Sequence, residues 1–478
     1  IKSGAQLYID IWDSKGPMIF WINALGVGTD YSRWGVFFIE VCFETIALFI
    51  AYWVLKRMYG ILPALGTVFI GAGLLKLVIG SGNSTEEYSF LFTWIAIASL
   101  VLLMTKNKST FWSFFLIGAS TVINFLLRAN NIGTQIIVIL AAIFHVYTNE
   151  RETKLWRAVT YLIIGALTIA IPVSLYFIIN GSFKAMIDAS IIYNFSYSTA
   201  TGHPFSNSIL PAIGIFRYWL LALLVIWILC IWHMFDIKQK GFTPFLLLTI
   251  LALPIEIFMS SISGRGYTHY FICWIPACML LIAFGFSIVQ NEAIDMNFRR
   301  KCETTHTIII LVLLCLITIG TSFNTVYDTV KFLGASIIRP NINREYREPA
   351  AKVVRDLTDD TDKVLVFAGQ AGINIMAQRD SIKGALFYPA INNSDIGIEV
   401  QNDYFKHLQE EQPLLILDGH TFHPQQIPAI DPSTRKNQRF VVSFSENLEQ
   451  VLDWINENYE RYDEANGYII YRLRSSSQ

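Results

Sequence analysis

Apolar runs long enough to cross a hydrocarbon core of about 30 Å recur over the first two thirds of this 478-residue chain. They predict about ten membrane spans, at 35–55, 62–79, 90–104, 111–127, 135–147, 158–179, 215–234, 245–259, 270–289 and 307–323. The run 135–147 is short, so we expect this span to be tilted or partly re-entrant. Only 15% of the residues are charged, against about 25% in soluble proteins. The sequence therefore predicts an α-helical polytopic membrane protein.

Basic residues indicate how the spans are oriented. If the spans alternate, successive basic groups all fall on one side, which the positive-inside rule assigns to the cytoplasm. These groups are Lys56 with Arg57, Lys106 with Lys108, Arg151 to Arg157, Lys238 with Lys240, and Arg299 to Lys301. The opposite side then holds the segments 1–33, 80–88, 128–133, 180–212 and 260–269, and everything after Asn324.

After Pro340 the pattern changes to short strands that alternate with amphipathic helices. The expected helices are 348–357, 398–411 and 448–462, and the expected strands are 363–367, 413–417 and 467–473. This alternation is typical of a small α/β domain with a partly parallel sheet. We divide the chain into a transmembrane domain, 1–335, and an extracytoplasmic α/β domain, 340–478. Asp418, His420 and His423 are a potential metal-ligand group, but we favour a strand end followed by a surface loop.

Composition and motifs exclude several classes of protein. The net charge is −1 and no basic stripe stands out, which argues against a nucleic-acid partner. The six cysteines have the spacing of neither a zinc site nor a dense disulfide framework. The cytoplasmic loops are short, and the chain has no Walker motif and no G-x-G-x-x-G between a strand and a helix. We expect no cofactor, and a divalent cation stays open.

A short polar turn interrupts the apolar sequence near the start of the chain, in YIDIWDSKGPMIFWINALG. Asp10, Asp13 and Lys15 lie close together, and Pro17 interrupts any helix because it lacks an amide donor. One interpretation is an interfacial anchor, with tryptophans at the lipid headgroups and charges in water. The other is a membrane-surface site in which Lys15 binds an anionic group, and we favour this one.

Further ionisable clusters fall on the same expected side of the membrane. They are Glu86 with Glu87, Arg128, and Arg265 with His269 and Tyr270. Each alone fits a snorkelling cation, an interfacial aromatic or a solvated loop acid. Together they suit transfer from a lipid phosphate, because cations stabilise the departing phosphate while a carboxylate deprotonates an acceptor hydroxyl. The activated lipid–sugar bond would supply the energy, so no ATP site is required.

The first loop carries a resemblance to a known family. Tyr8, Asp10, Asp13, Lys15 and Pro17 fit a Y-x-D-x-x-D-x-K-x-P segment that recurs in polyprenyl-phosphate-dependent glycosyltransferases of the GT-C superfamily. The chain resembles the bacterial protein mannosyltransferase-like and aminoarabinose-transferase-like group. The segments NSTEEY and RGYTHY are similar to that group too, and so is the order of many spans before an outer C-terminal domain. The resemblance therefore covers nearly the whole chain.

This resemblance implies a hexosyl- or pentosyltransferase of the cytoplasmic membrane. It would transfer a sugar from a polyprenyl-phosphate donor to a lipid, glycan or protein acceptor on the outer face, among membrane lipids. The implied catalytic acid is Glu86 or Glu87. The implied substrate-binding residues are Lys15 as the phosphate ligand, with Asp10, Asp13, Arg128, Arg265, His269 and Tyr270. In the superfamily the catalytic aspartate lies upstream of the Lys-Pro segment, so we expect it, with a further span, before Ile1.

Two other classes of protein stay open. A transporter or flippase for lipid-linked sugars would show paired repeats, broken helices and charges near mid-bilayer. The charges of this chain gather at one face instead, which favours the enzyme. A non-catalytic subunit of glycan assembly would fit a chain without the upstream aspartate.

Overall fold

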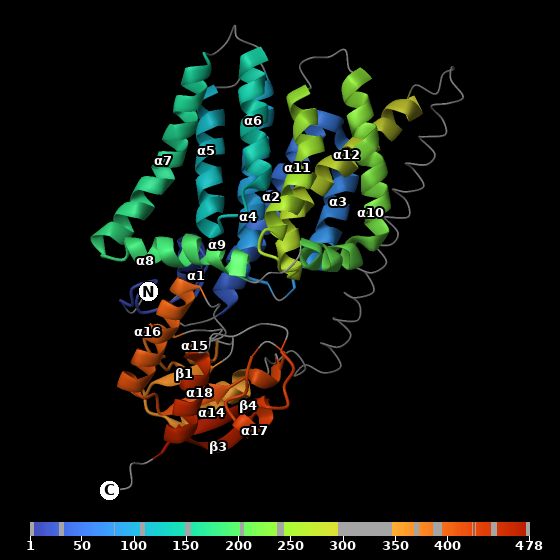
Figure 1. Cartoon of the computed structure of the whole chain (residues 1–478). Helices are drawn as coiled ribbons and strands as arrows, with labels where there is room; N and C mark the ends of the chain where they lie inside the picture. Colours follow the sequence, from blue (N-terminus) through green and yellow to red (C-terminus); the bar gives the residue numbers. More distant parts are fainter. Residues whose placement is uncertain are drawn as a thin grey trace.

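The computed structural model describes most of the chain. The described residues are 4–27, 33–80, 82–105, 110–148, 154–200, 205–236, 243–294, 347–367, 372–385, 394–422, 424–425, 427–440 and 447–474. Figure 1 shows two parts, a helical bundle and a smaller domain of helices and strands below one end of it. The boundary expected at 335–340 lies outside the described residues.

Long apolar helices form the bundle. They are α2 (Arg33–Tyr59), α3 (Ile61–Val78), α4 (Thr85–Met104), α5 (Thr110–Leu127), α6 (Gly133–Thr148), α7 (Leu155–Ile179), α10 (Phe205–Asp236), α11 (Thr243–Ser261) and α12 (Trp274–Ile294). Among the described residues, 7 helices are long and apolar enough to span a membrane, or 8 if the bent α10 is one span. Helix α6 has only 16 residues, as its short apolar run predicts. The predicted span 307–323 lies outside the described residues. The expectation of a polytopic helical membrane protein is confirmed.

Helix α4 begins earlier than the apolar run predicts. Glu86 and Glu87, expected in the preceding loop, form part of its first turn. Ser84 precedes the helix with extended backbone angles, and acidic side chains interact favourably with the positive end of a helix dipole. The polar residues therefore continue the helix beyond its apolar part.

Short helices cover the end of the bundle that faces the smaller domain. They are α1 (Pro17–Val27), α8 (Phe183–Ile187), the π-helical turn η1 (Asp188–Ile192), α9 (Tyr193–Ala200) and the 3-10 turn η3 (Thr268–Cys273). In Figure 1, α8 and α9 run across the bundle end rather than along it. The expected loop 180–212 is thus largely a helical layer between the bundle and the C-terminal domain.

The C-terminal domain contains a four-stranded mixed sheet with the order β1-β2-β4-β3. Its strands are β1 (Val364–Phe367), β2 (Leu415–Asp418), β3 (Tyr459–Ala465) and β4 (Tyr468–Leu473). Strands β1 and β2 are parallel, whereas β4 is antiparallel to both of its neighbours. The helices are α14 (Arg347–Leu357), α15 (Gly372–Ala377), α16 (Asp395–Glu411), η4 (His420–Phe422), α17 (Pro432–Arg435) and α18 (Asn447–Asn458). The described residues of this region thus form an α/β arrangement with a partly parallel sheet.

The expected helix 448–462 is wrong in its last turn. Helix α18 ends at Asn458, and the chain continues directly into the edge strand β3. The dipeptide Asn466-Gly467 has positive φ at both residues, 51° and 82°, so it forms the tight turn between β3 and β4. Cross-strand pairing with β4 therefore overrides the amphipathic pattern.

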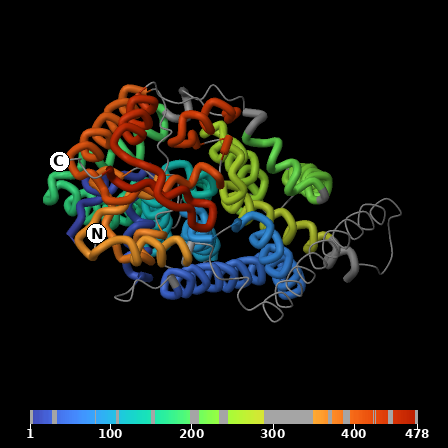
Figure 2. Tube along the Cα trace, turned by 90° about the horizontal axis from the view of Figure 1, so that it is seen from below, coloured from blue at the N-terminus to red at the C-terminus, as the bar shows by residue number. Residues whose placement is uncertain are grey.

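The C-terminal domain contacts the first loop of the chain. The amide of Gly384 donates to the carbonyl oxygen of Asp10 (2.9 Å), and Lys383 Nζ lies 3.4 Å from Asp10 Oδ1. Trp12 and Tyr193 meet edge to face at 4.9 Å and pack against the core that contains α16 and α18. Figure 2 shows the orange and red domain over this end of the bundle, with α10 to one side. The first loop therefore lies between the two parts.

Candidate functional site

The first loop folds into a compact turn against the bundle. Tyr8, with a positive φ of 71°, donates its amide to Ile11 (2.7 Å) and its hydroxyl to the carbonyl of Lys15 (2.7 Å). Its ring is buried against Phe177, with the centroids 5.7 Å apart, and burial raises the pKa of the Tyr8 hydroxyl above its usual range. The loop therefore presents Lys15 from a fixed backbone.

Gly16 attaches this loop to the end of α5. Its amide donates to the carbonyl of Leu127 (3.2 Å), and a Cβ at this position would lie 2.0 Å from the carbonyl oxygen of Leu126. Only glycine allows this approach. Pro17 then starts α1, where its missing amide proton is no loss. The Lys-Gly-Pro sequence thus places Lys15 next to the residue that follows α5, which is Arg128.

Lys15 is a half-exposed cation at the rim of the cluster. Its Nζ lies 3.2 Å from Asp13 Oδ2, and its amide donates to Asp13 Oδ1 (3.0 Å). The Asp13 carboxylate raises the pKa of Lys15, burial acts against this, and Tyr270 and Arg128 exert smaller opposing effects. Lys15 is therefore protonated at neutral pH, and it lies within electrostatic reach of Arg128 and Tyr270.

Arg128 is the centre of the cluster. Its guanidinium forms an ion pair with Glu86, a side chain only 1% exposed, and lies 3.7 Å from the centre of the Tyr270 ring. Burial lowers the pKa of Arg128, but Tyr270 and Glu86 outweigh this effect, so the net pKa is raised. Glu86 also accepts a hydrogen bond from Thr85 (2.9 Å). The segments 80–88 and 128–133, both expected on the outer side of the membrane, thus meet at η3.

His269 joins this cluster from the same turn as Tyr270. Its ring packs edge to face on Tyr270 at 4.8 Å and stacks on Tyr267 at 5.8 Å. The charges of Glu86, Arg128 and Lys15 act on it, so it lies in the same electrostatic neighbourhood. Arg265 lies in the turn between α11 and η3.

Two expected site residues face other partners. Glu87 follows Glu86 directly, but its carboxylate lies with Glu40 and Glu44 of α2. Consecutive helical residues point about 100° apart, so one turn cannot aim both acids at Arg128. Asp10 accepts the amide of Gln6 (2.8 Å) and pairs with Lys383 of the C-terminal domain. Its contacts position the loop against that domain.

Polar residues that were not predicted from the sequence support the site through hydrogen bonds. Asn124 is fully buried in α5 and donates to Thr93 Oγ1 (3.1 Å) and to the carbonyl of Asn131 (3.3 Å). Asn194 of α9 donates to the carbonyl of Ser14 (2.7 Å). An asparagine inside an apolar span was the available signal, because buried amides require partners.

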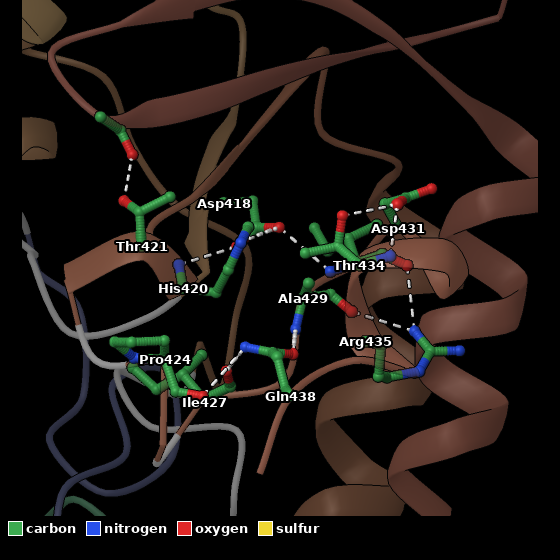
Figure 3. A network of polar contacts seen from close by, with 12 residues as sticks. Asp418, His420, Thr421, Pro424, Ile427, Ala429, Asp431, Thr434, Arg435 and Gln438 are labelled. Carbon is green, nitrogen blue, oxygen red and sulfur yellow. Dashed lines mark hydrogen bonds and ion pairs between the residues drawn. The ribbon is translucent and has the colours of Figure 1, made fainter. Parts of the chain in front are cut away.

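Asp418 and His420 of the C-terminal domain form loop contacts with each other and with neighbouring residues (Figure 3). Asp418, at the end of β2, is fully buried and accepts the amides of His420 (2.9 Å) and Ile430 (3.0 Å). Nδ1 of His420 lies 2.9 Å from the same carboxylate. His423 lies outside the described residues. These contacts fit the favoured strand end followed by a loop.

The long apolar helices, the ionisable cluster at one end of them and the mixed sheet together define a polytopic membrane protein with a small α/β part. Residues 14–177 match the family model described as dolichyl-phosphate-mannose-protein mannosyltransferase. This match to part of the chain agrees with the resemblance to GT-C glycosyltransferases that the sequence motifs indicate. No curated protein sequence matches the chain.

Solved structures share this fold. The fold is similar to that of ArnT from Cupriavidus metallidurans bound to undecaprenyl phosphate, with a TM-score of 0.60 at 12% identity over 97% of this chain and 89% of that chain. The apo state of ArnT gives a TM-score of 0.56 at 12% identity, over 96% and 88% of the two chains. The archaeal oligosaccharyltransferase AglB from Archaeoglobus fulgidus, in complex with an inhibitory peptide and a dolichol-phosphate, gives 0.50 at 10% identity, over 100% and 69%. At these identities the likeness concerns the fold.

Proposed function

We propose that this protein is a membrane glycosyltransferase that transfers a hexose or pentose from a polyprenyl-phosphate donor to an acceptor on the outer face of the cytoplasmic membrane. The observation that carries the proposal is the meeting of Lys15, Arg128 and the turn 267–270 at one end of an apolar bundle. These residues come from loops that the charge pattern assigns to the outer side.

The cations suit a phosphate leaving group. The guanidinium of Arg128 carries five N–H donors, and Glu86 occupies one side of it, so donors remain for phosphate oxygens. Lys15 adds a second charge from the exposed rim. Preorganised cations of this kind stabilise the charge that develops as the sugar–phosphate bond breaks. Glu86 acts as a positioning residue for Arg128 in this arrangement. His269, Tyr270 and Arg265 would complete the donor site.

A cavity lined in part by the first loop suits the acceptor. It has a volume of about 210 Å³ and lies between the first loop, the α8–η1 turn and α16. Its lining includes Tyr8, Trp12, Asp188, Glu399 and Asp403. Aromatic faces and carboxylates together bind sugar rings and hydroxyl groups well. The C-terminal domain thus supplies one wall of the acceptor site, without supplying the phosphate ligands.

The test is sugar transfer by the Lys15→Ala variant in proteoliposomes that contain a polyprenyl-phosphate sugar. We expect turnover at saturating donor to fall about 10²-fold, because one preorganised charge is removed from the transition state. Lys406→Ala is the matched control, since Lys406 is an exposed lysine of α16 whose Nζ lies 3.9 Å from Glu410. Unchanged turnover in Lys15→Ala would contradict the assigned role. Translocation of the lipid-linked sugar without transfer would contradict the enzyme itself.

A further inference from the structure

Three carboxylates meet where α2 packs against the start of α4. Glu40 and Glu44 are four positions apart, so they share one face of α2, and Glu87 comes from the first turn of α4. One oxygen of each residue lies within 4.8 Å of the others. We call Glu40, Glu44 and Glu87 the acidic triad. It is a different cluster from the donor site, because Arg128 pairs with Glu86.

Some carboxylate oxygens of the triad accept no hydrogen bond from the described residues. The amide of Asn83 donates to Glu40 Oε1 (3.1 Å), and the hydroxyl of Ser84 donates to Glu87 Oε1 (3.0 Å). Glu87 is 1% exposed, yet its Oε2 has no hydrogen-bond partner among the residues that the structure describes. The same holds for Glu44 Oε1. A buried carboxylate oxygen without a donor is energetically unfavourable, so this geometry calls for a positively charged ligand.

The electrostatics point the same way. The charge of Glu40 acts on Glu44, and the charges of Glu40 and Glu44 act on Glu87. Like charges at this separation repel one another strongly where the surroundings are partly apolar. Either bound protons or a cation between the carboxylates relieves this repulsion. Hard divalent cations prefer carboxylate oxygens, at about 2.1 to 2.5 Å. Oxygens within 4.8 Å of one another are close enough to bind one such ion after small side-chain adjustments.

We propose that the acidic triad binds one hard divalent cation, of the Mg²⁺, Ca²⁺ or Mn²⁺ class, between α2 and α4. Glu40, Glu44 and Glu87 each supply an oxygen, and water completes the coordination shell. Glu87 Oε2 gains the partner that it otherwise lacks.

The bound cation would also position the donor site. Glu86 precedes Glu87 in the same helical turn, so fixing Glu87 against α2 fixes the direction of the Glu86 side chain toward Arg128. This role is one of positioning, because no triad residue touches the phosphate cations in the described contacts. The site would then be structural, with an indirect effect on donor affinity.

The experiment measures Mn²⁺ binding to the full chain in detergent, by electron paramagnetic resonance after removal of metals with a chelator. We expect one bound ion per chain, displaced by Ca²⁺ or Mg²⁺. Glu44→Gln and Glu40→Gln should each weaken binding about tenfold or more, because ligand charge sets the affinity of such sites. Glu256→Gln is the matched control, since Glu256 is a buried carboxylate of α11 that pairs with the amide of Thr134 (2.5 Å). This variant should bind Mn²⁺ as the wild type does.

A thermal unfolding series separates loss of ligand from loss of fold. Without metal, Glu44→Gln should be at least as stable as the wild type, because one repulsive charge is gone. With Mn²⁺, only the wild type and Glu256→Gln should gain stability. The absence of a bound ion in the wild type would overturn the proposal and leave protons shared within the triad. Equal Mn²⁺ binding by Glu44→Gln and the wild type would overturn it as well. Neither result would affect the transfer test on Lys15.

Discussion

Arg128 and Glu86 form a largely buried ion pair in the cluster at the end of the bundle. Glu86 is buried, and Arg128 neutralises it while packing on Tyr270. Loss of one partner of a buried pair leaves an uncompensated charge, which costs about 3 kcal/mol or more. We therefore expect Arg128→Met to cause a clear decrease in the thermal unfolding temperature of the protein in detergent.

The double variant Arg128→Met/Glu86→Gln tests whether the stability effects of the two side chains are coupled. Because it removes both charges together, we expect it to recover much of the lost stability while remaining inactive in sugar transfer. If the single and double variants unfolded at the same temperature, the two side chains would not be coupled.

The sequence reveals which residue types are suited to the site, but it does not show where they point. Lys15, Arg128 and Tyr270 stand out as ionisable or aromatic residues where apolar runs end, and the structure brings them together. Glu86 and Glu87 are indistinguishable in the sequence. Only the start of α4 decides which one meets Arg128, and this start depends on a turn that hydropathy does not predict.

The connection between the first loop and α5 is a close backbone contact at Gly16. We expect Gly16→Ala to push the loop off Leu126 and displace Lys15, because the new Cβ would overlap a carbonyl oxygen. A misplacement of about 1 Å at a reacting centre can lower turnover about 10²-fold. Gly214→Ala in α10 is the control, since a Cβ there meets no atom within 4 Å. The transfer assay should show a loss in the first variant alone.

The short helix α17 depends on its N-cap. Asp431 accepts the amide of Thr434 (2.8 Å) and the hydroxyls of Ser433 (2.5 Å) and Thr434 (2.8 Å). Hydrogen bonds from Ser433 and Thr434 lower the pKa of Asp431 to about 2. Because the folded pKa lies below the unfolded value of about 3.9, this stabilisation is complete above about pH 4. It is lost as the pH falls toward about 2.

Asp431→Ala should therefore destabilise α17 by about 1 kcal/mol at neutral pH. Hydrogen–deuterium exchange of the peptide 431–438 measures this directly. The difference between variant and wild type should shrink in acid, as the wild-type carboxylate becomes protonated. A difference that is unchanged at about pH 2 would contradict the assigned role of the charge.

At the level of elements, the helices of the bundle and the first strands of the sheet follow from hydropathy. The edge strand β3 does not, because YERYDEA is largely polar and exposed, and its strand state comes from pairing with β4. The Asn466-Gly467 turn was the sequence signal for this hairpin. The layer of α8, η1 and α9 escaped prediction because interfacial helices lack a long apolar run.

The whole molecule is held together partly at Asp10. This residue pairs with Lys383 and accepts the amide of Gly384, so it fixes the C-terminal domain against the first loop. We expect Asp10→Lys to lower the rate of acceptor use up to about fivefold, since an exposed ion pair contributes up to about 1 kcal/mol. The charge-swapped variant Asp10→Lys/Lys383→Asp should restore most of the rate. A swapped variant as slow as the single variant would exclude domain docking as the cause.

The gathering of distant segments at one end of the molecule was predictable from the parity of the spans. Segments of the first loop, 128–133, 180–212 and 260–269 lie at that end, as the basic residues indicate. The docking of the C-terminal domain was not predictable, because it depends on individual side-chain contacts, such as that between Trp12 and Tyr193. Contacts between single side chains produce no periodic pattern of residues in a sequence.

The adjacency of Glu86 and Glu87 in one helical turn has a thermodynamic consequence. Suppose that a divalent ion at the acidic triad raises the affinity for the donor by holding this turn. Donor binding must then raise the affinity for the ion by the same factor, because linkage between two ligands is reciprocal. The membrane-bound donor would thus regulate the metal content of the protein. Cells short of lipid-linked sugar would hold more of this protein in its ion-free form.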